Sequence, residues 1–129
     1  MEITVTLEQA REPVAVMRLQ GGIDASNFVQ IVDKAREIYQ NPARNLIIDL
    51  SDVPSISSTG LAAVHKIALI YSGNPDQMKH PDQTHSSDAR RHVKLLSPQP
   101  EVEKSLETAG LKLFFKVFRD LESALKSFS

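Results

Sequence analysis

Two kinds of hydrophobic periodicity alternate along this chain, and their alternation restricts the possible folds more than any other feature. Apolar side chains at every second position, typical of a half-buried strand, occupy residues 3–7, and a second strand-like segment covers residues 14–19. From residue 25 onward, segments with apolar residues at helical spacing are separated by short apolar runs. The pattern predicts an α/β fold with the element order β-β-α-β-α-β-α-β-α.

The predicted elements imply a mixed, mostly parallel sheet of about five strands with about four helices. The later strands are expected at residues 45–50, 93–96 and 113–118, and the helices at residues 25–40, 61–71, 100–109 and 121–128. Asp24 or Ser26 is expected to cap the first helix. Helices between successive strands require right-handed crossovers and parallel pairing, whereas the short connection between the first two strands favours an antiparallel hairpin.

Length and composition indicate one domain over residues 1–129. Residues 74–92 contain Met78 as their only large aliphatic side chain and bury too little apolar area to offset their ordering entropy, so we expect a mobile loop there. The longest nearly apolar stretch, residues 61–71, is far shorter than the roughly 20 residues of a membrane span. With no signal peptide visible, we expect a cytoplasmic protein without membrane insertion.

The charge balance and the missing motifs exclude several classes of function. Lys and Arg number 15 against 16 Asp and Glu, which does not suit direct nucleic-acid binding through a basic field. The chain has no cysteine, and neither common glycine-rich phosphate-binding motif occurs. The His and Asp residues of 74–92 share no metal-ligand spacing. We therefore expect no cofactor, no bound metal and no catalytic residue.

Ser58 stands where a strand has just led into a helix, which is also the place of the nucleophile in many serine hydrolases. A nucleophile elbow needs G-x-S-x-G, and the residues around Ser58 lack the first glycine. His65 lies about two helical turns, or ~10 Å, beyond Ser58, too far for a hydrogen bond between the two side chains. These two observations argue against hydrolase chemistry at Ser58.

Ser57-Ser58-Thr59-Gly60 stands where a strand leads into the predicted helix of residues 61–71. The first N–H groups of a helix lack partners within it and favour an anion. A phosphate on Ser58 is therefore compatible with this position. A plain N-cap role for Ser58 explains the same residues, and the residue types alone leave both interpretations open.

The same residues resemble a STAS domain of the bacterial anti-sigma-factor antagonist family. The resemblance rests on L-I-I-D-L-S-D-V at 46–53, I-S-S-T-G-L at 56–61 and L-Q-G-G-I-D at 19–24. The ending is also similar, with A-G-L at 109–111 and E-S-A-L at 122–125. The similarity covers nearly the whole chain apart from residues 74–92.

The resemblance implies a partner-switching regulator. In this family, the serine that matches Ser58 is phosphorylated by an anti-sigma factor that is also a kinase, and a phosphatase reverses the modification. Thr59 is the second choice of phosphorylation site. Asp24 and Asp49 match acidic positions of the family near the switch. The partner surface would comprise Asp24 and the helix start with its first turns (Ser57, Ser58, Thr59, Gly60, Leu61 and Val64).

Two departures from the family pattern leave an alternative open. Ser57 stands where many members have Asp, and the loop of residues 74–92 is longer than usual. The alternative is a STAS accessory subunit of a transporter or larger signalling assembly, in which Ser58 serves as a cap. Apolar residues on several sides of the helix 61–71 fit either a docking surface or complete burial.

Overall fold

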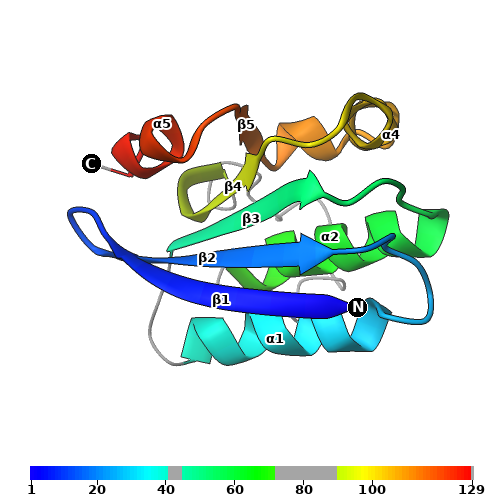
Figure 1. The fold of residues 1–129 in the computed structure, drawn as a ribbon, viewed down its shortest axis with the longest axis horizontal. Coiled ribbons are helices and arrows are strands. Elements are labelled where there is room, and N and C mark those ends of the chain that lie inside the picture. The colour runs from blue at the N-terminus through cyan, green and yellow to red at the C-terminus, as the bar shows by residue number, and fades with distance from the viewer. Residues whose placement is uncertain (41–44, 72–89, 129) are drawn as a thin grey trace.

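The computed structural model describes residues 1–40, 45–71 and 90–128, which form a five-stranded sheet with helices on both sides (Figure 1). The strands are β1 (Glu2–Gln9), β2 (Pro13–Gln20), β3 (Asn45–Asp52), β4 (Val93–Leu96) and β5 (Lys116–Phe118). The helices are α1 (Phe28–Gln40), α2 (Ser58–Tyr71), α4 (Pro100–Thr108) and α5 (Leu121–Lys126), with a 3-10 helix η3 (Leu111–Leu113). This arrangement confirms the predicted α/β class and element order.

The strands lie in the order in which they occur along the chain, β1-β2-β3-β4-β5. β1 and β2 form the predicted antiparallel hairpin, and β2, β3, β4 and β5 pair in parallel. Because each parallel strand is placed on the same side of its predecessor, right-handed crossovers bring α1, α2 and α4 to one face of the sheet.

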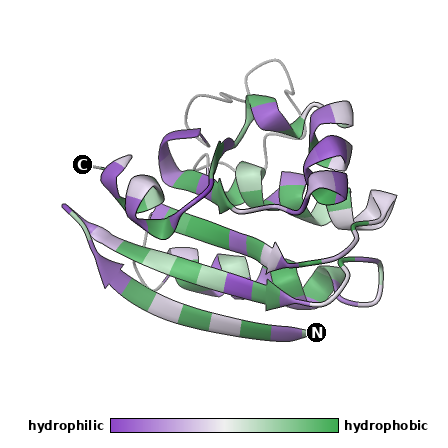
Figure 2. Ribbon diagram, turned by 45° about the horizontal axis from the view of Figure 1, so that its top comes forward, coloured by the Kyte–Doolittle hydropathy of each residue, from purple (hydrophilic) through white to green (hydrophobic). Residues whose placement is uncertain are grey.

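The main core lies between that face and the three crossover helices. Alternate residues of β3, Leu46, Ile48 and Leu50, point into it and are completely buried. Eight residues of α2 are buried, so this helix is covered on most sides, as one interpretation of its sequence predicted. The alternation of hydrophobic and hydrophilic residues along the strands is visible in Figure 2.

The opposite face of the sheet carries a second, smaller apolar cluster. Val14, Val16, Ile47 and Leu96 of the strands pack there against Ala124 of α5. Since Ile47 and its neighbours Leu46 and Ile48 are all fully buried, the prediction that β3 is covered on both faces is confirmed. α5 alone among the helices of the described residues reaches this second cluster.

Several predicted boundaries change. α1 begins at Phe28 rather than Ala25, because residues 25–27 form a turn. The last strand, predicted at 113–118, is reduced to Lys116–Phe118, because Gly110 adopts a left-handed conformation (φ 77°) and the chain then forms η3. Of the predicted loop, residues 74–89 lie outside the described residues, and residues 90–92 are helical.

No helix of the described residues is long and apolar enough to span a lipid bilayer.

Candidate functional site

The start of α2 is organised by Ser57, which caps the helix. Its hydroxyl accepts a hydrogen bond from the backbone N–H of Gly60 (3.1 Å), and its carbonyl oxygen accepts the N–H of Leu61 (2.9 Å). Both bonds are those of an N-cap residue. The interpretation of Ser58 as the cap is therefore wrong, and the capping role belongs to its neighbour.

Ser58 and Thr59 are the first two residues of α2, and both are exposed. With Ser57 as the cap, the Ser58 hydroxyl has no hydrogen-bond partner among the described residues. It lies at a helix N-terminus, where unpaired N–H groups and the helix dipole favour negative charge. A phosphoryl group on Ser58 would break no hydrogen bond that the structure shows.

The segment after β2 holds the start of α2 in place. The N–H of Ile23 donates to Ser55 O (3.0 Å), and the N–H of Ser57 donates to Ile23 O (2.9 Å), so that Ile23 and Ile56 form a short parallel bridge. A Cβ at Gly60 would lie 2.6 Å from Ile23 O. Glycine is thus required at position 60, because the backbone of another segment occupies the side-chain position.

Asp24 directly follows this bridge and is exposed. Its carboxylate accepts hydrogen bonds from the backbone N–H (2.8 Å) and the hydroxyl (2.5 Å) of Ser26, which lower the pKa of Asp24 below its usual value. These bonds close a turn before α1. Asn27 occupies the position before Phe28, and its carbonyl oxygen accepts the N–H of Ile31 (3.0 Å). The predicted capping of α1 by Asp24 or Ser26 is thus wrong.

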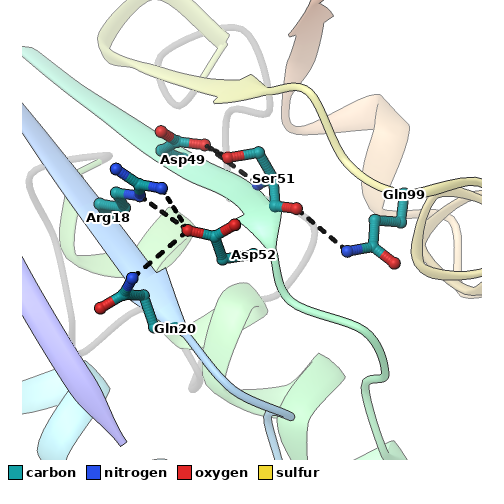
Figure 3. A network of polar contacts seen from close by, with 6 residues as sticks. All are labelled: Arg18, Gln20, Asp49, Ser51, Asp52 and Gln99. Atoms are coloured by element: carbon teal, nitrogen blue, oxygen red, sulfur yellow. Dashed lines mark hydrogen bonds and ion pairs between the residues drawn. The ribbon is translucent and has the colours of Figure 1, made fainter.

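A polar network fixes the end of β3, from which the chain runs to Ser58 (Figure 3). The Asp52 carboxylate accepts hydrogen bonds from Arg18 (Nε, 2.9 Å) and Gln20 (3.4 Å) of β2, and these bonds lower the pKa of Asp52. On the other side, the Gln99 side chain donates to Ser51 O (3.0 Å). β2 on one side and the residue before α4 on the other therefore hold the end of β3.

Asp49, which the sequence resemblance placed near the switch, lies within this network. Its carboxylate accepts hydrogen bonds from the backbone N–H (3.0 Å) and the hydroxyl (2.7 Å) of Ser51. In the sheet register it lies opposite Arg18. These contacts give Asp49 a local structural role at the end of β3.

A shallow groove continues from the start of α2 toward α4 and η3. It consists of two adjoining hollows of about 300 and 230 Å³ that share Leu61 and Ala109. The rings of His65 and Phe114 meet edge to face at its far end, with their centroids 5.2 Å apart. Partial burial lowers the pKa of His65 below its usual value, so the imidazole is uncharged at neutral pH. The hollow beside His65 is therefore mainly apolar, whereas Lys104 of α4 brings a positive charge to the other hollow.

The sequence prediction did not include this groove. Phe114 was expected within a strand, and it lies beside His65 because η3 ends at Leu113. The helical repeat places four residues along one side of α2, namely Ser58, Leu61, Ala62 and His65. Their spacing in the sequence could have indicated a continuous surface.

The predicted partner-binding residues divide according to their exposure. Asp24, Ser57, Ser58 and Thr59 are exposed and Leu61 is half-buried, so all five reach the surface at one end of the sheet. Val64 is 1% exposed and belongs to the main core, so its prediction as a surface contact is wrong. Gly60 is also buried, and its role is to allow close packing.

No group of three His, Asp or Glu side chains suited to a metal ion occurs within residues 1–40, 45–71 and 90–128. His80 and His85, which the sequence analysis considered as ligands, lie outside the described residues. His65 packs on Phe114, and no hydrogen bond joins it to Ser58.

Residues 6–70, just over half of the chain, match the family model of the STAS domain. The chain belongs to the STAS domain family. The match includes β2, β3 and most of α2, and therefore the residues that position Ser58. No curated protein matches this STAS domain at a significant level.

Solved structures of anti-sigma factor antagonists share the fold. A proposed antagonist from Thermotoga maritima superposes with a TM-score of 0.76 at 17% identity, covering 98% of this chain and 93% of the other. An antagonist from Mycobacterium paratuberculosis gives 0.68 at 20% identity, with coverages of 98% and 94%. Phosphorylated SpoIIAA from Bacillus gives 0.57 at 20% identity, with coverages of 98% and 100%. At these identities, the likeness establishes the fold of this STAS domain.

Proposed function

We propose that this STAS domain is an anti-sigma-factor antagonist that switches partners through phosphorylation of Ser58. Two findings support the proposal: the fold shared with solved antagonists, one of them in a phosphorylated form, and the exposed hydroxyl at the start of α2. In this proposal the domain is a kinase substrate and a binding module in the cytoplasm, and it catalyses no reaction.

The unmodified domain would bind an anti-sigma factor that has serine-kinase activity. The contact surface would be formed by the exposed residues Asp24, Ser57, Ser58 and Thr59 and would extend over Leu61 into the apolar groove. Apolar contacts in the groove would supply affinity, while the helix start would present the hydroxyl to the kinase. Val64 and Gly60 would support this surface from beneath.

Phosphorylation would then release the domain. A phosphoryl group adds about −1.5 to −2 charge and three acceptor oxygens to a surface that is buried in the complex. A loss of about 3 kcal/mol, the order of one uncompensated interfacial charge, lowers affinity more than a hundredfold. No conformational change is needed, because the helix start already favours an anion, and a phosphatase would restore binding.

The single observation that carries the proposal is that Ser57 and Ser58 have different roles at the start of α2. Ser57 caps α2, so the Ser58 side chain has no capping role; its hydroxyl is exposed and has no hydrogen-bond partner in the part of the chain that the structure describes. Ser57 also shows how a member without Asp at this position starts its helix. We therefore expect phosphorylation at Ser58 and not at Ser57.

The test is incubation with ATP and the kinase-like anti-sigma factor encoded nearest to this gene, followed by peptide mass spectrometry. We expect one phosphate, on Ser58, that Ser58→Ala abolishes and the matched variant Thr59→Ala retains. Ser58→Asp should weaken binding to the same partner, whereas Ser58→Ala should preserve it. Because Asp carries less charge than phosphoserine, its effect should be smaller than that of phosphorylation.

Strong binding without any phosphate on Ser58 or Thr59 would contradict the switch and favour the alternative of an accessory subunit. Circular dichroism of each variant provides the control for folding. Since the Ser58 hydroxyl makes no hydrogen bond to the described residues, Ser58→Ala is expected to retain the thermal stability of the wild type.

A further inference from the structure

Lys104 lies on α4 but takes no part in the ion pairs of that helix. Lys112 pairs with Glu103 (2.8 Å) and with Glu107 (3.7 Å), and Arg119 also pairs with Glu103 (2.8 Å). The Lys104 ammonium has neither an ion pair nor a hydrogen bond to any residue that the structure describes. Since its acidic neighbours on α4 bind other cations, the exposed charge of Lys104 is available to another anion.

The groove between α2 and α4 places Lys104 on the side of Ser58. Together with Leu61 of α2, Lys104 lines the hollow of about 300 Å³. The adjoining hollow is lined by Ala62 and His65, which follow Leu61 along α2 and lead away from Ser58. Leu61 is the residue of α2 that both hollows share, so the hollow of Lys104 lies toward the start of that helix.

The spacing along α2 brings Ser58 close to this hollow. Ser58 and Leu61 are one turn apart on the same side of the helix, with their Cβ atoms about 5–6 Å from each other. A lysine side chain extends on the order of 6 Å beyond its Cα, and its flexible stem lets the ammonium follow an anion. The Lys104 ammonium and a phosphoryl group on Ser58 can therefore meet at the edge of the hollow without movement of either helix.

Two other basic side chains were compared with Lys104, and neither can take its place. Arg18 of β2 already binds Asp52 through its Nε (2.9 Å). Lys66 lies on α2 itself, about two turns, or ~12 Å, beyond Ser58. Lys104 therefore combines a position beside the start of α2 with a charge that has no carboxylate partner among the described residues.

We propose that Lys104 binds the phosphoryl group of Ser58 and so bridges α2 and α4 in the phosphorylated state. The inference rests on the proposed phosphorylation of Ser58 and adds to it the residue that receives the modification. Hydrogen bonds between an ammonium and a phosphate are roughly twice as strong as those between neutral groups. Because the phosphoryl group carries about −1.5 to −2 charge, one lysine leaves the surface negative, and the electrostatic cause of release remains.

The pair would also change the surface that the partner meets. In the unmodified chain, Lys104 offers a positive charge beside the hollow, where it can bind a carboxylate of the partner. Phosphorylation would engage this charge within the chain and draw the lysine stem over the edge of the hollow. The partner would then lose a cation and part of an apolar contact, in addition to meeting a phosphate.

Phosphoserine incorporated at position 58 during translation tests the pair without any kinase. Phosphorus-31 NMR follows the pH titration of the phosphoryl group in the full chain. A nearby ammonium favours the dianion, so we expect Lys104→Met to lower the acid dissociation constant of the phosphoryl group about twofold or more. Lys104→Arg should retain the constant of the unchanged chain. Lys66→Met, which also removes one lysine charge, is the matched control and should leave the constant unchanged.

The other titratable side chains near this end of the groove, Asp24, His65 and Glu101, are the same in every variant. The difference between the variants therefore isolates the contribution of the lysine. Roughly 1 M salt should remove most of this difference, because the pair is exposed to solvent. A dissociation constant that Lys104→Met leaves unchanged, or that Lys66→Met lowers equally, would overturn the proposed pair.

Failure of the pair and failure of the proposed function give different results. If no kinase phosphorylates Ser58, the switch is refuted, while the titration of the incorporated phosphoserine still decides whether Lys104 binds it. If the kinase phosphorylates Ser58 and Lys104→Met leaves the titration unchanged, the pair is refuted and the switch stands.

Discussion

The two faces of the sheet are built very differently, although the same strands supply both. The face toward α1, α2 and α4 carries the main core, to which three crossover helices contribute. The other face carries the small cluster beneath α5 and, at the end of β2 and β3, the exposed Arg18–Asp52 ion pair. Within residues 1–40, 45–71 and 90–128, the crossover helices supply most of the packing, and the six-residue helix α5 closes part of the second face.

Two adjacent residues of β3 provide the sharpest test of this difference. Ile48 and Ile47 are both completely buried, but Ile48 points into the main core and Ile47 into the cluster beneath α5. We expect Ile48→Ala to lower the free energy of unfolding by about 4–5 kcal/mol and Ile47→Ala by about 2–3 kcal/mol, since a short helix can relax into the cavity. Urea denaturation of both variants measures the two values. Equal losses would show that the two faces are packed equally tightly.

Lys94 gives the next largest effect, and it has the opposite sign. It is 6% exposed on the face beneath α5, its ammonium lies 5.3 Å from the centroid of the Phe128 ring, and burial lowers its pKa from 10.5 to about 8. The folded state therefore binds this proton more weakly than the unfolded state. The resulting destabilisation is fully present below pH 8 and disappears as the pH rises through 10.5.

We accordingly expect Lys94→Met to raise the free energy of unfolding at pH 7 by about 1–3 kcal/mol. The gain over the wild type should shrink between pH 8 and pH 10.5, which denaturation at several pH values measures. A gain that is independent of pH would show that the lysine is not desolvated. Lys104→Met, at an exposed position of α4, is the control and should leave stability nearly unchanged.

Phe128 tests how much the end of the chain contributes to the second face. Its ring packs against the small cluster and covers the Lys94 ammonium. Phe128→Ala should lower the free energy of unfolding by about 1 kcal/mol, through lost apolar contact and a lost cation–π interaction. It should also raise the pKa of Lys94, because the ammonium gains solvent. Differential scanning calorimetry detects the first effect, and an unchanged melting temperature would mean that the ring contributes little.

The smallest effect is expected for the polar part of the second face. Arg18 and Asp52 are both substantially exposed, and exposed ion pairs contribute little to stability. Arg18→Ala should therefore shift the urea midpoint less than Phe128→Ala does. Because Arg18 lowers the pKa of Asp52, the stability from this pair is present at neutral pH and is lost as the pH falls through the acidic range. A larger shift at neutral pH would show that Arg18 organises the end of β3.

The sequence was sufficient to predict which helices and strands form, but it located the ends of some of them incorrectly. β4 was predicted at Val93–Leu96 as observed, because a short apolar run between turn residues is a local signal. The start of β5 was missed, because η3 depends on how the chain packs after Gly110. The start of α1 was also misplaced, because Asp24 and Asn27 are both common capping residues and only their hydrogen bonds distinguish them.

For the candidate site too, the sequence located the elements correctly but did not assign the roles of individual side chains. The motif of residues 57–60 located the start of α2, and the family match includes it. The sequence could not distinguish Ser57 from Ser58 as the cap, since the two side chains are identical and differ by one position along the helix. Val64 was assigned to the surface because apolar residues occur on several sides of α2, and helical periodicity then indicates no single buried side.

By itself, the sequence determined the order of the elements, the parallel sheet and the place of the serines at a helix start, because hydrophobic periodicity and turn residues act locally. Only the tertiary structure decided which serine is free, that Gly60 must lack a side chain, and that Phe114 meets His65 beside the groove. Those features depend on contacts between segments far apart in the chain, such as the bridge from Ile23 to Ile56. Local sequence patterns do not specify the geometry of such contacts.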